Sequence, residues 1–199
     1  MKDIESFLSW KHNDYHSVVE LPDNYTVLDL SVNPWIPSKT EFSIGKYDEV
    51  RPNMYLTPIF GGIRNIHVGL DINGPIGTPC MAFMDGKITH LGYNPEPGDY
   101  GYVIITKHNI SGIELWALYG HLSSESIEGK IVGQKVRKGE IIAWFGPENE
   151  NGGWEPHLHF QLSLLEPKTH DLPGVVSDVE RIQALENYPD PRLILGPLY

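Results

Sequence analysis

The stretch GGWEPHLHFQL, residues 152–162, places two histidines one residue apart in a run where polar and apolar side chains alternate. Successive side chains of a β-strand point to opposite faces, and neighbours on one face lie about 7 Å apart. His157, His159 and Gln161 therefore share a face that can donate, accept or ligate. The opposite face is apolar: Leu158, Phe160, Leu162 and Leu164. Such a strand could line a metal or catalytic site, or it could present an exposed polar face at the edge of a sheet.

The length and charge of the chain limit the classes of function. Its 199 residues suit one domain with a sizeable core. The 15 Lys and Arg against 26 Asp and Glu give a formal net charge of −11, which disfavours binding to phosphates or anionic lipid. We therefore expect neither nucleic acid nor a membrane as a partner, and the sequence leaves the oligomeric state open.

The N-terminal stretch and the cysteine content indicate the cellular compartment in which the protein works. Residues 1–16, MKDIESFLSWKHNDYH, carry charged residues where a secretory signal needs an unbroken apolar core. No later segment approaches the length needed to span a bilayer. Cys80 is the only cysteine, so no internal disulfide can form, and we expect it to pack as a small hydrophobe. These features predict a cytoplasmic protein.

The chain divides into three segments by its pattern. Residues 1–50 are mixed in character, with a possible short helix near Ile4 to His12, and are interpreted as an N-terminal extension. Residues 51–167 consist mostly of short β-like runs separated by glycine-containing turns, which is typical of an all-β domain. Residues 168–199 form a C-terminal extension that we expect to pack on the core. The predicted fold class is mainly β, a compact antiparallel sheet or sandwich-like domain with short helical extensions.

Local signals predict two hairpins and one helix within this plan. One hairpin turns at Asp85-Gly86 and the other near Ser111-Gly112, because Asp-Gly and Ser-Gly pairs favour tight turns. The stretch SDVERIQALEN, residues 177–187, predicts a helix, and the Pro-rich end after it is expected to lie along the domain surface.

The run IHVGLDI, residues 66–72, offers His67 and Asp71, four residues apart. On a flat strand they would lie about 13 Å apart, too far to share an ion that each must approach to about 2 Å. Flanking Pro and Gly residues argue against a helix, which would bring them together. A turn or bulge at Gly69 could do so instead.

His121 is a third candidate, because it follows an apolar strand and a glycine in ALYGHLSSES, residues 117–126. A lone histidine in this place is more often a surface or core residue. Here His121 is one of several such residues. Four others also lie within or at the end of apolar runs: His67, Asp71, His157 and His159. The other histidines lie in polar or turn contexts and are interpreted as surface residues: His12, His16, His90, His108 and His170.

The ordered set HVGLD, LYGHLS and PHLHFQL, with VRKGEIIAWFG between the last two, resembles the lysostaphin-type zinc peptidases of family M23. The resemblance implies a compact antiparallel β-domain with zinc in a groove between loops. It also implies three zinc ligands, His67, Asp71 and His159, and two catalytic histidines, His121 and His157. Members of the family often place a tyrosine near the zinc ahead of the first ligand, a position for which Tyr55 is the nearest candidate and Arg51 a substitute.

A closer resemblance extends beyond this core. YDEVRPNMY, NGGWEPHLHFQL, DLPGVV and PDPRLILG are similar to the peptidase-like module that some bacterial proteins carry between a kinase-like and an aminotransferase module. The best-known members of the family are exported and cut peptidoglycan, whereas a cytoplasmic protein would act on a small or soluble amide. The expected partner is therefore a peptide or a peptidoglycan fragment.

The resemblance implies hydrolysis by a water that Zn2+ activates. Two imidazoles and one carboxylate leave an open position on a four-coordinate ion, and the two remaining histidines can accept a proton or stabilise the tetrahedral intermediate. Two other classes stay open. A non-haem iron enzyme also uses two histidines and one carboxylate, and a catalytically silent zinc-containing module could bind or regulate a partner.

The N-terminal extension is expected to lie across the groove. Latent members of the family that the chain resembles cover their zinc with a segment ahead of the core. Three asparagines could offer an amide oxygen there: Asn24, Asn33 and Asn53. Deleting residues 1 to about 45 is then expected to raise activity rather than unfold the domain.

Overall fold

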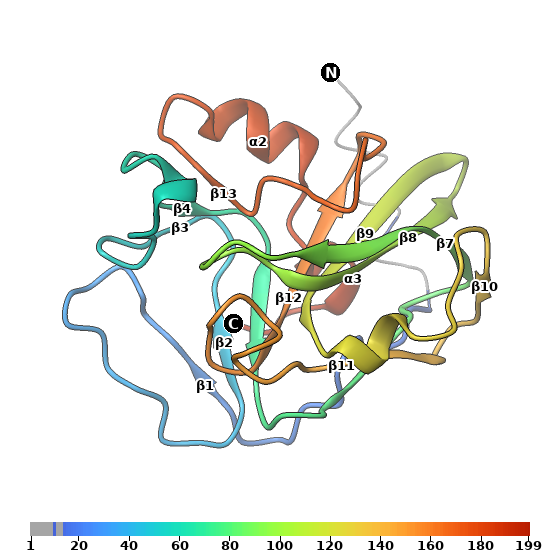
Figure 1. Cartoon of the computed structure of the whole chain (residues 1–199), viewed down its shortest axis with the longest axis horizontal. Helices are drawn as coiled ribbons and strands as arrows, with labels where there is room; N and C mark the ends of the chain where they lie inside the picture. The colour runs from blue at the N-terminus through green and yellow to red at the C-terminus, as the bar shows by residue number, and fades with distance from the viewer. Residues whose placement is uncertain (1–9, 11–13) are drawn as a thin grey trace.

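The computed structural model describes Trp10 and residues 14–199, so the helix expected near Ile4 to His12 lies outside the described residues apart from Trp10. An eight-stranded sheet organises the chain (Figure 1). Its strands in spatial order are β1 (Thr26–Val27), β2 (Ser43–Gly45), β5 (Leu70–Asn73), β12 (His157–Ser163), β9 (Ile113–Leu122), β8 (Gly101–Ile110), β7 (Gly86–Asn94) and β10 (Lys135–Val136). All neighbours are antiparallel except β1 and β2. The mainly β, antiparallel fold class is confirmed.

Two small sheets and short helices complete the fold. One small sheet contains β13 (Val175–Val176), β4 (Ile66–His67) and β3 (Glu49–Val50), and the other pairs β11 (Ile141–Trp144) with β6 (Pro79–Met81). In residues 14–199 the helical elements are η1 (Pro58–Phe60), η2 (Ser124–Ile127), α2 (Arg181–Asn187) and α3 (Arg192–Leu195). The predicted C-terminal helix is therefore confirmed as α2. No helix in the described part of the chain has the length and apolarity needed to cross a membrane.

Strand β12 lies inside the sheet, between β5 and β9, and its two faces differ as the sequence predicts. Leu158, Phe160 and Leu162 belong to the main hydrophobic core, where the Phe160 ring lies 5.1 Å from the Tyr119 ring. His157 and the other polar side chains of β12 are buried too, but they point to the opposite face. The alternative of an exposed edge strand is wrong, because β12 has a partner on both sides.

The hairpin predicted at Ser111-Gly112 is confirmed. The two ten-residue strands β8 and β9 pair along their length, with Ile110 opposite Ile113. Ser111 and Gly112 have φ values of 52° and 86°. Positive φ at both central residues is the requirement of the tight turn that matches the twist of two antiparallel strands.

The hairpin predicted at Asp85-Gly86 is wrong. β6 pairs with β11, where Cys80 lies opposite Ala143, whereas β7 pairs with β8 and β10. Between β6 and β7 the chain passes from the two-stranded sheet to the eight-stranded one, and Phe83 in this segment is buried in the main core. Cys80 is buried as predicted, and burial raises the pKa of its thiol.

The segments outside residues 51–167 contribute to the same sheet and core. β1 and β2 extend the sheet beyond β5, and Val18 and Val19 are buried in the main core. At the other end of the chain, Ile194 reaches that core from α3. A deletion of residues 1 to about 45 would remove β1, β2 and the core contacts of Val18 and Val19, so the expectation that it leaves the fold intact is not supported.

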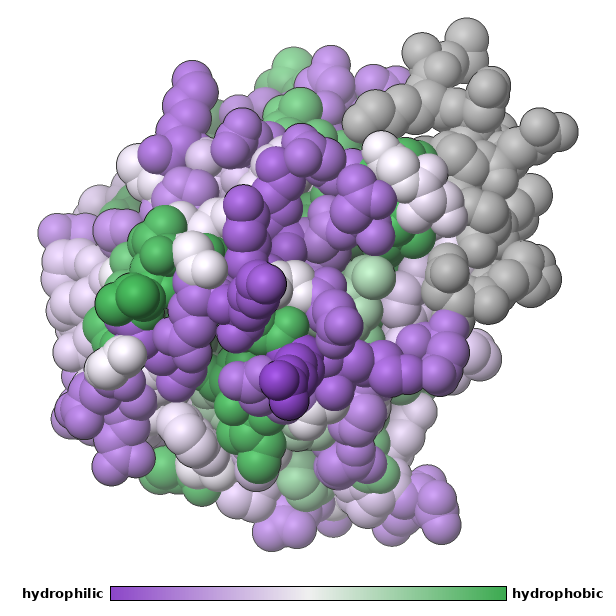
Figure 2. All heavy atoms as spheres, turned by 90° about the vertical axis from the view of Figure 1, so that its right-hand side faces the viewer, coloured by the Kyte–Doolittle hydropathy of each residue, from purple (hydrophilic) through white to green (hydrophobic). Residues whose placement is uncertain are grey.

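The sheet ends at β10, and this side of the molecule faces the viewer in Figure 2. Hydrophilic residues predominate there, and hydrophobic ones lie in separate patches. β10 is two residues long, and its Lys135 is exposed. A short edge strand that carries a lysine discourages pairing with another chain.

Candidate metal centre

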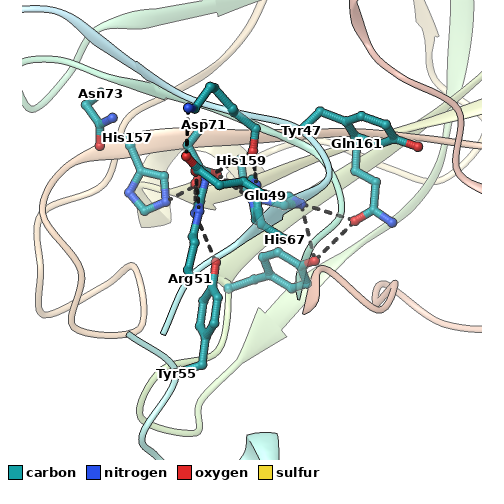
Figure 3. A network of polar contacts seen from close by, with 12 residues as sticks. Tyr47, Glu49, Arg51, Tyr55, His67, Asp71, Asn73, His157, His159 and Gln161 are labelled. Carbon is teal, nitrogen blue, oxygen red and sulfur yellow. Dashed lines mark hydrogen bonds and ion pairs between the residues drawn. The ribbon is translucent and has the colours of Figure 1, made fainter. Parts of the chain in front are cut away.

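Three ligand-type atoms converge where β4, β5 and β12 meet (Figure 3). His67 Nε2 lies 3.1 Å from Asp71 Oδ1, and His159 Nδ1 lies 3.0 Å from both atoms. All three side chains are buried. A tetrahedral ion with nitrogen and oxygen ligands at 2.0–2.1 Å holds those ligands about 3.3 Å apart. The three residues therefore form a site that could hold a metal ion, and the donor set fits one.

A break in the chain at Gly69 brings His67 and Asp71 together. His67 ends β4 of the small sheet and Asp71 lies in β5 of the large sheet, so the two residues are not on one flat strand. Gly69 has φ 139°, and a Cβ there would lie 2.5 Å from His159 Cε1. The bend predicted at Gly69 is confirmed, and the glycine also makes room for the third ligand-type side chain.

Hydrogen bonds fix which nitrogen of His67 and His159 faces this point. His67 Nδ1 lies 2.9 Å from the carbonyl oxygen of Lys46, and His159 Nε2 lies 3.1 Å from Gln161 Oε1. Both partner oxygens only accept, so these nitrogens must carry the hydrogen. The remaining nitrogens are then unprotonated and direct their lone pairs at each other and at Asp71.

The two carboxylate oxygens of Asp71 have different partners. Oδ1 faces the histidines, whereas Oδ2 accepts a hydrogen bond of 2.7 Å from Arg51 Nη1. Burial opposes ionisation of Asp71, but the positive charge that His67 takes up in acid and the permanent charge of Arg51 outweigh it, and they hold the pKa of the carboxyl well below its usual value. Asp71 is therefore ionised at neutral pH, as metal binding requires.

His121 and His157 flank the same point, and their ring centroids lie 4.1 Å apart. His157 Nδ1 donates to the carbonyl of Glu155 over 2.6 Å, and His121 Nδ1 donates to the carbonyl of Asn151 over 2.7 Å. Each histidine therefore keeps its Nε2 unprotonated. His157 Nε2 lies 3.9 Å from Asp71 Oδ1.

The backbone of His121 is unusual, since its φ of 63° lies in the left-handed region that few residues other than glycine adopt. The pairing of β8 with β9 shifts register between Tyr102 and Ile104, opposite this part of β9. An irregularity of this kind turns a side chain away from its regular direction. It is how His121, at the end of β9, reaches His157.

Burial favours the neutral form of three of these histidines: His67, His121 and His157. It lowers the pKa of His157, and it lowers that of His67 to about 4, where the nearby Arg51 adds to the effect. Burial followed by the neighbouring His157 and His159 lowers the pKa of His121 well below its usual value. At neutral pH these imidazoles can accept a proton or a metal ion.

A cavity of about 1220 Å³ opens over these residues. The N-terminal segment lines it with Leu30 and Trp35, and later loops line it with Tyr55 and Trp154. Asn33 and Asn53 also line the cavity, but the hydrogen bonds of His67, Asp71 and His159 involve other residues. The extension is therefore one wall of the cavity, as well as part of the sheet.

The structure brings all five candidate residues together and adds partners that the sequence did not reveal. Tyr100 packs 5.2 Å from the His159 ring and donates to the Leu172 carbonyl over 3.1 Å. Glu49 pairs with Arg51 over 3.0 Å. The only sequence signal for Glu49 was its spacing of two from Arg51, which puts both on one face of a strand. The interpretation of His108 as a surface residue is wrong, because it is buried.

Comparisons with known proteins agree with this geometry. A sequence model described as "Peptidase family M23" matches residues 65–170. An uncharacterised metalloprotease of Haemophilus influenzae is 33% identical over 147 residues, which is 70% of this chain and 29% of the relative. The peptidoglycan DD-endopeptidase ShyC of Vibrio cholerae is 31% identical over 126 residues, which is 61% of this chain and 26% of the relative. The chain thus spans less than a third of the length of either relative.

A known structure has a similar fold. The catalytic domain of the antimicrobial peptidase lysostaphin from Staphylococcus simulans is 25% identical and superposes with a TM-score of 0.53. The match covers 78% of this chain and 93% of that domain. The architecture described above is therefore of the lysostaphin type.

Proposed function

The chain belongs to peptidase family M23, whose model matches just over half of it, and on that premise we propose that it is a zinc-dependent metallo-endopeptidase. It would hydrolyse peptide bonds in peptidoglycan-type or other short peptides. His67, Asp71 and His159 would hold the ion, and His121 and His157 would act on the reacting groups. These roles follow the family resemblance of the three motifs.

One observation carries the proposal. Three electron-pair donors face each other at 3.0–3.1 Å, and the hydrogen bonds on the far nitrogens of both imidazoles leave no proton between them. Such an arrangement is repulsive unless a cation lies among the three atoms. Protonation of His67 would require a pH near 4, because its pKa is lowered to about that value. A divalent ion is the cation that suits neutral pH.

Zinc is favoured over iron by the surroundings of the triad. Two histidines and one carboxylate occur in both hydrolytic zinc sites and non-haem iron oxygenases. Here two further buried histidines, His121 and His157, direct an unprotonated nitrogen towards the same region. Proton transfer needs such groups, and hydrolysis depends on proton transfer.

When bound, zinc supplies a Lewis acid that polarises the scissile carbonyl and lowers the pKa of water. The chain's own residues would handle the protons. His121 and His157 enter the reaction neutral, so either Nε2 can accept a proton from water and return it to the leaving amine. The carbonyls of Asn151 and Glu155 stabilise the charged imidazoles and keep them oriented.

The substrate is proposed from the relatives and the cavity together. The Vibrio cholerae relative is a peptidoglycan DD-endopeptidase by name, and this chain covers 26% of that protein. Aromatic walls such as Trp35 and Trp154 suit a peptide or a sugar-linked peptide. If the closer resemblance to the module of kinase-like and aminotransferase proteins holds, a soluble amide would replace the cell wall as substrate. Cell fractionation would test the predicted cytoplasmic location.

The test combines metal analysis with a substrate panel. Purified protein is treated with a chelator, reloaded with Zn2+ or Fe2+, and assayed on short peptides, peptidoglycan fragments and intact sacculi. The proposal expects one zinc per chain and hydrolysis that only the reloaded protein performs. Stoichiometric iron in the isolated protein would favour the oxygenase alternative. Bound zinc without hydrolysis of any member of the panel would favour the silent binding module.

A further inference from the structure

The guanidinium of Arg51 is buried directly behind the candidate metal centre, and the side chain is 2% exposed. Its Nη1 donates to Asp71 Oδ2 over 2.7 Å, and its Nε donates to Glu49 Oε2 over 3.0 Å (Figure 3). Burial disfavours the charge of Arg51, but Tyr55, Asp71 and Glu49 outweigh it and raise its pKa. The side chain is therefore a permanent cation enclosed by two carboxylates.

Every nitrogen of this guanidinium has a protein partner. Besides the two carboxylates, Nη1 donates to the Tyr55 hydroxyl over 2.9 Å and Nη2 donates to the Lys46 carbonyl over 3.3 Å. Arg51 also lines the cavity, but protein groups rather than a substrate engage all three nitrogens of its guanidinium. Through these contacts Arg51 can orient the carboxylate of Asp71 instead.

We propose that Arg51 is a positioning residue of the metal centre, which holds Asp71 by Oδ2 so that Oδ1 alone is offered to the ion. The inference rests on the proposed metal-binding function. A carboxylate without this restraint can rotate and offer either oxygen or both. Partners that orient metal ligands typically change affinity by 10- to 100-fold when they are removed.

The same short segment also orients a second ligand. The Lys46 carbonyl accepts from His67 Nδ1 over 2.9 Å and from Arg51 Nη2 over 3.3 Å. Next to it, a Cβ on Gly45 would lie 2.7 Å from Arg51 Nη2 and 3.2 Å from Asp71 Cβ. Residues 45–51 thus form a bracket behind two of the three ligands, and they lie outside the 65–170 match to the family.

The bracket connects the metal centre to the wall of the cavity. Glu49 accepts from Arg51 through Oε2, and its other oxygen, Oε1, accepts from the backbone nitrogen of Leu30 over 3.0 Å. Leu30 itself lines the cavity. The chain of contacts from Leu30 through Glu49 and Arg51 to Asp71 ties the N-terminal wall to the metal ligands.

The experiment is a titration of apo protein with Co2+, a zinc substitute whose visible absorption reports coordination. Arg51→Lys keeps the charge but cannot hold Glu49 and Asp71 together, because one ammonium lacks the planar fork. We expect Co2+ affinity to fall 10- to 100-fold and the absorption band to change in shape and intensity. The matched control is Arg181→Lys, since Arg181 also holds one aspartate, Asp48, through two bonds of 2.8 and 2.9 Å.

Two outcomes would overturn the inference. One is a folded Arg51→Lys protein whose Co2+ affinity and spectrum stay within about twofold of wild type, and the other is a wild type that binds no Co2+. If Arg51→Lys does not fold, Gly45→Ala supplies the test, because its methyl group displaces the guanidinium without changing a charge. A wild type that binds Co2+ but cleaves no substrate would refute the proposed peptidase function and leave the role of Arg51 standing.

Discussion

His108 and His159 are both buried histidines on strands of the same sheet, yet their environments differ. His108 Nε2 lies 2.7 Å from Thr106 Oγ1, and its Nδ1 donates to the Asp85 carbonyl over 3.0 Å. Both of its nitrogens are therefore satisfied within the fold. His159 donates from Nε2 to Gln161 Oε1, whereas its Nδ1 faces His67 and Asp71.

The difference teaches how a functional histidine can be distinguished from a structural one. Burial alone does not separate the two kinds of histidine, since it lowers the pKa of His108 to about 4, as it does that of His67. What distinguishes the metal-centre histidines is the partner of the second nitrogen: the Thr106 hydroxyl can donate to His108 Nε2, whereas His159 Nδ1 faces only His67 Nε2 and Asp71 Oδ1. The remaining lone pair then has no hydrogen-bond donor and is available for a ligand.

Loss of a ligand should have the largest effect. His159→Ala should remove stoichiometric metal and reduce peptidase activity by at least about 10⁴-fold, because two ligands rarely hold a catalytic ion. Elemental analysis and an activity assay check this. His108→Ala provides the comparison and should retain the metal. If both variants keep one zinc per chain, the distinction between the two kinds of histidine is wrong.

The two flanking histidines should show an intermediate effect. His121→Ala and His157→Ala should each keep the metal but lose about 10²- to 10⁴-fold in kcat, which is the usual range for a lost proton-transfer group or oxyanion contact. Metal content and kinetics of the same preparation separate the two properties. A His157 variant that loses zinc as completely as His67→Ala would make it a ligand rather than a catalyst.

Crowding at Gly69 should have a smaller effect on the same centre. Gly69→Ala places a methyl group 2.5 Å from His159 Cε1 and strains a backbone with φ 139°. We expect metal affinity to fall by at least about 10-fold, as for other changes that disturb ligand orientation. Gly112→Ala is the matched control, because its φ is 86° but nothing lies within 4 Å of the added Cβ. Equal metal affinities in a competition titration would contradict this account.

The smallest effect on activity is expected at His108. His108→Gln should change kcat by less than about twofold, while the free energy of unfolding falls by about 1–3 kcal/mol through lost hydrogen bonds. A large loss of activity at unchanged stability would show that His108 acts on the centre.

Acid should narrow the difference in stability between wild type and His108→Gln. The pKa of His108 is about 4 in the fold and about 6.5 when unfolded. The unfolded chain therefore binds the proton first, so the stability that neutral His108 contributes is complete above pH 6.5 and is lost as the pH falls towards 4. Denaturant titrations at pH 7 and 4.5 measure this. A constant difference between the two proteins would contradict burial as the cause of the shift.

Local patterns in the sequence determined a substantial part of this protein. The period of two in β12 separated His157, His159 and Gln161 from the core residues, and positive-φ turn residues located the β8–β9 hairpin. The ordered motifs also identified the family and five residues that meet in space. These features depend on neighbours a few residues apart, so they can be read from the chain itself.

Only the tertiary structure decided the features that join distant segments. β6 pairs with β11 instead of β7, and His108 is buried, because core packing overrides the local turn and polarity signals. The partners that select the metal-facing nitrogens, such as the Lys46 carbonyl for His67, come from elsewhere in the chain. Arg51 reaches Asp71 across 20 residues of sequence. The physical reason is that hydrogen bonds and packing act over a few ångströms in space, whatever the separation along the chain.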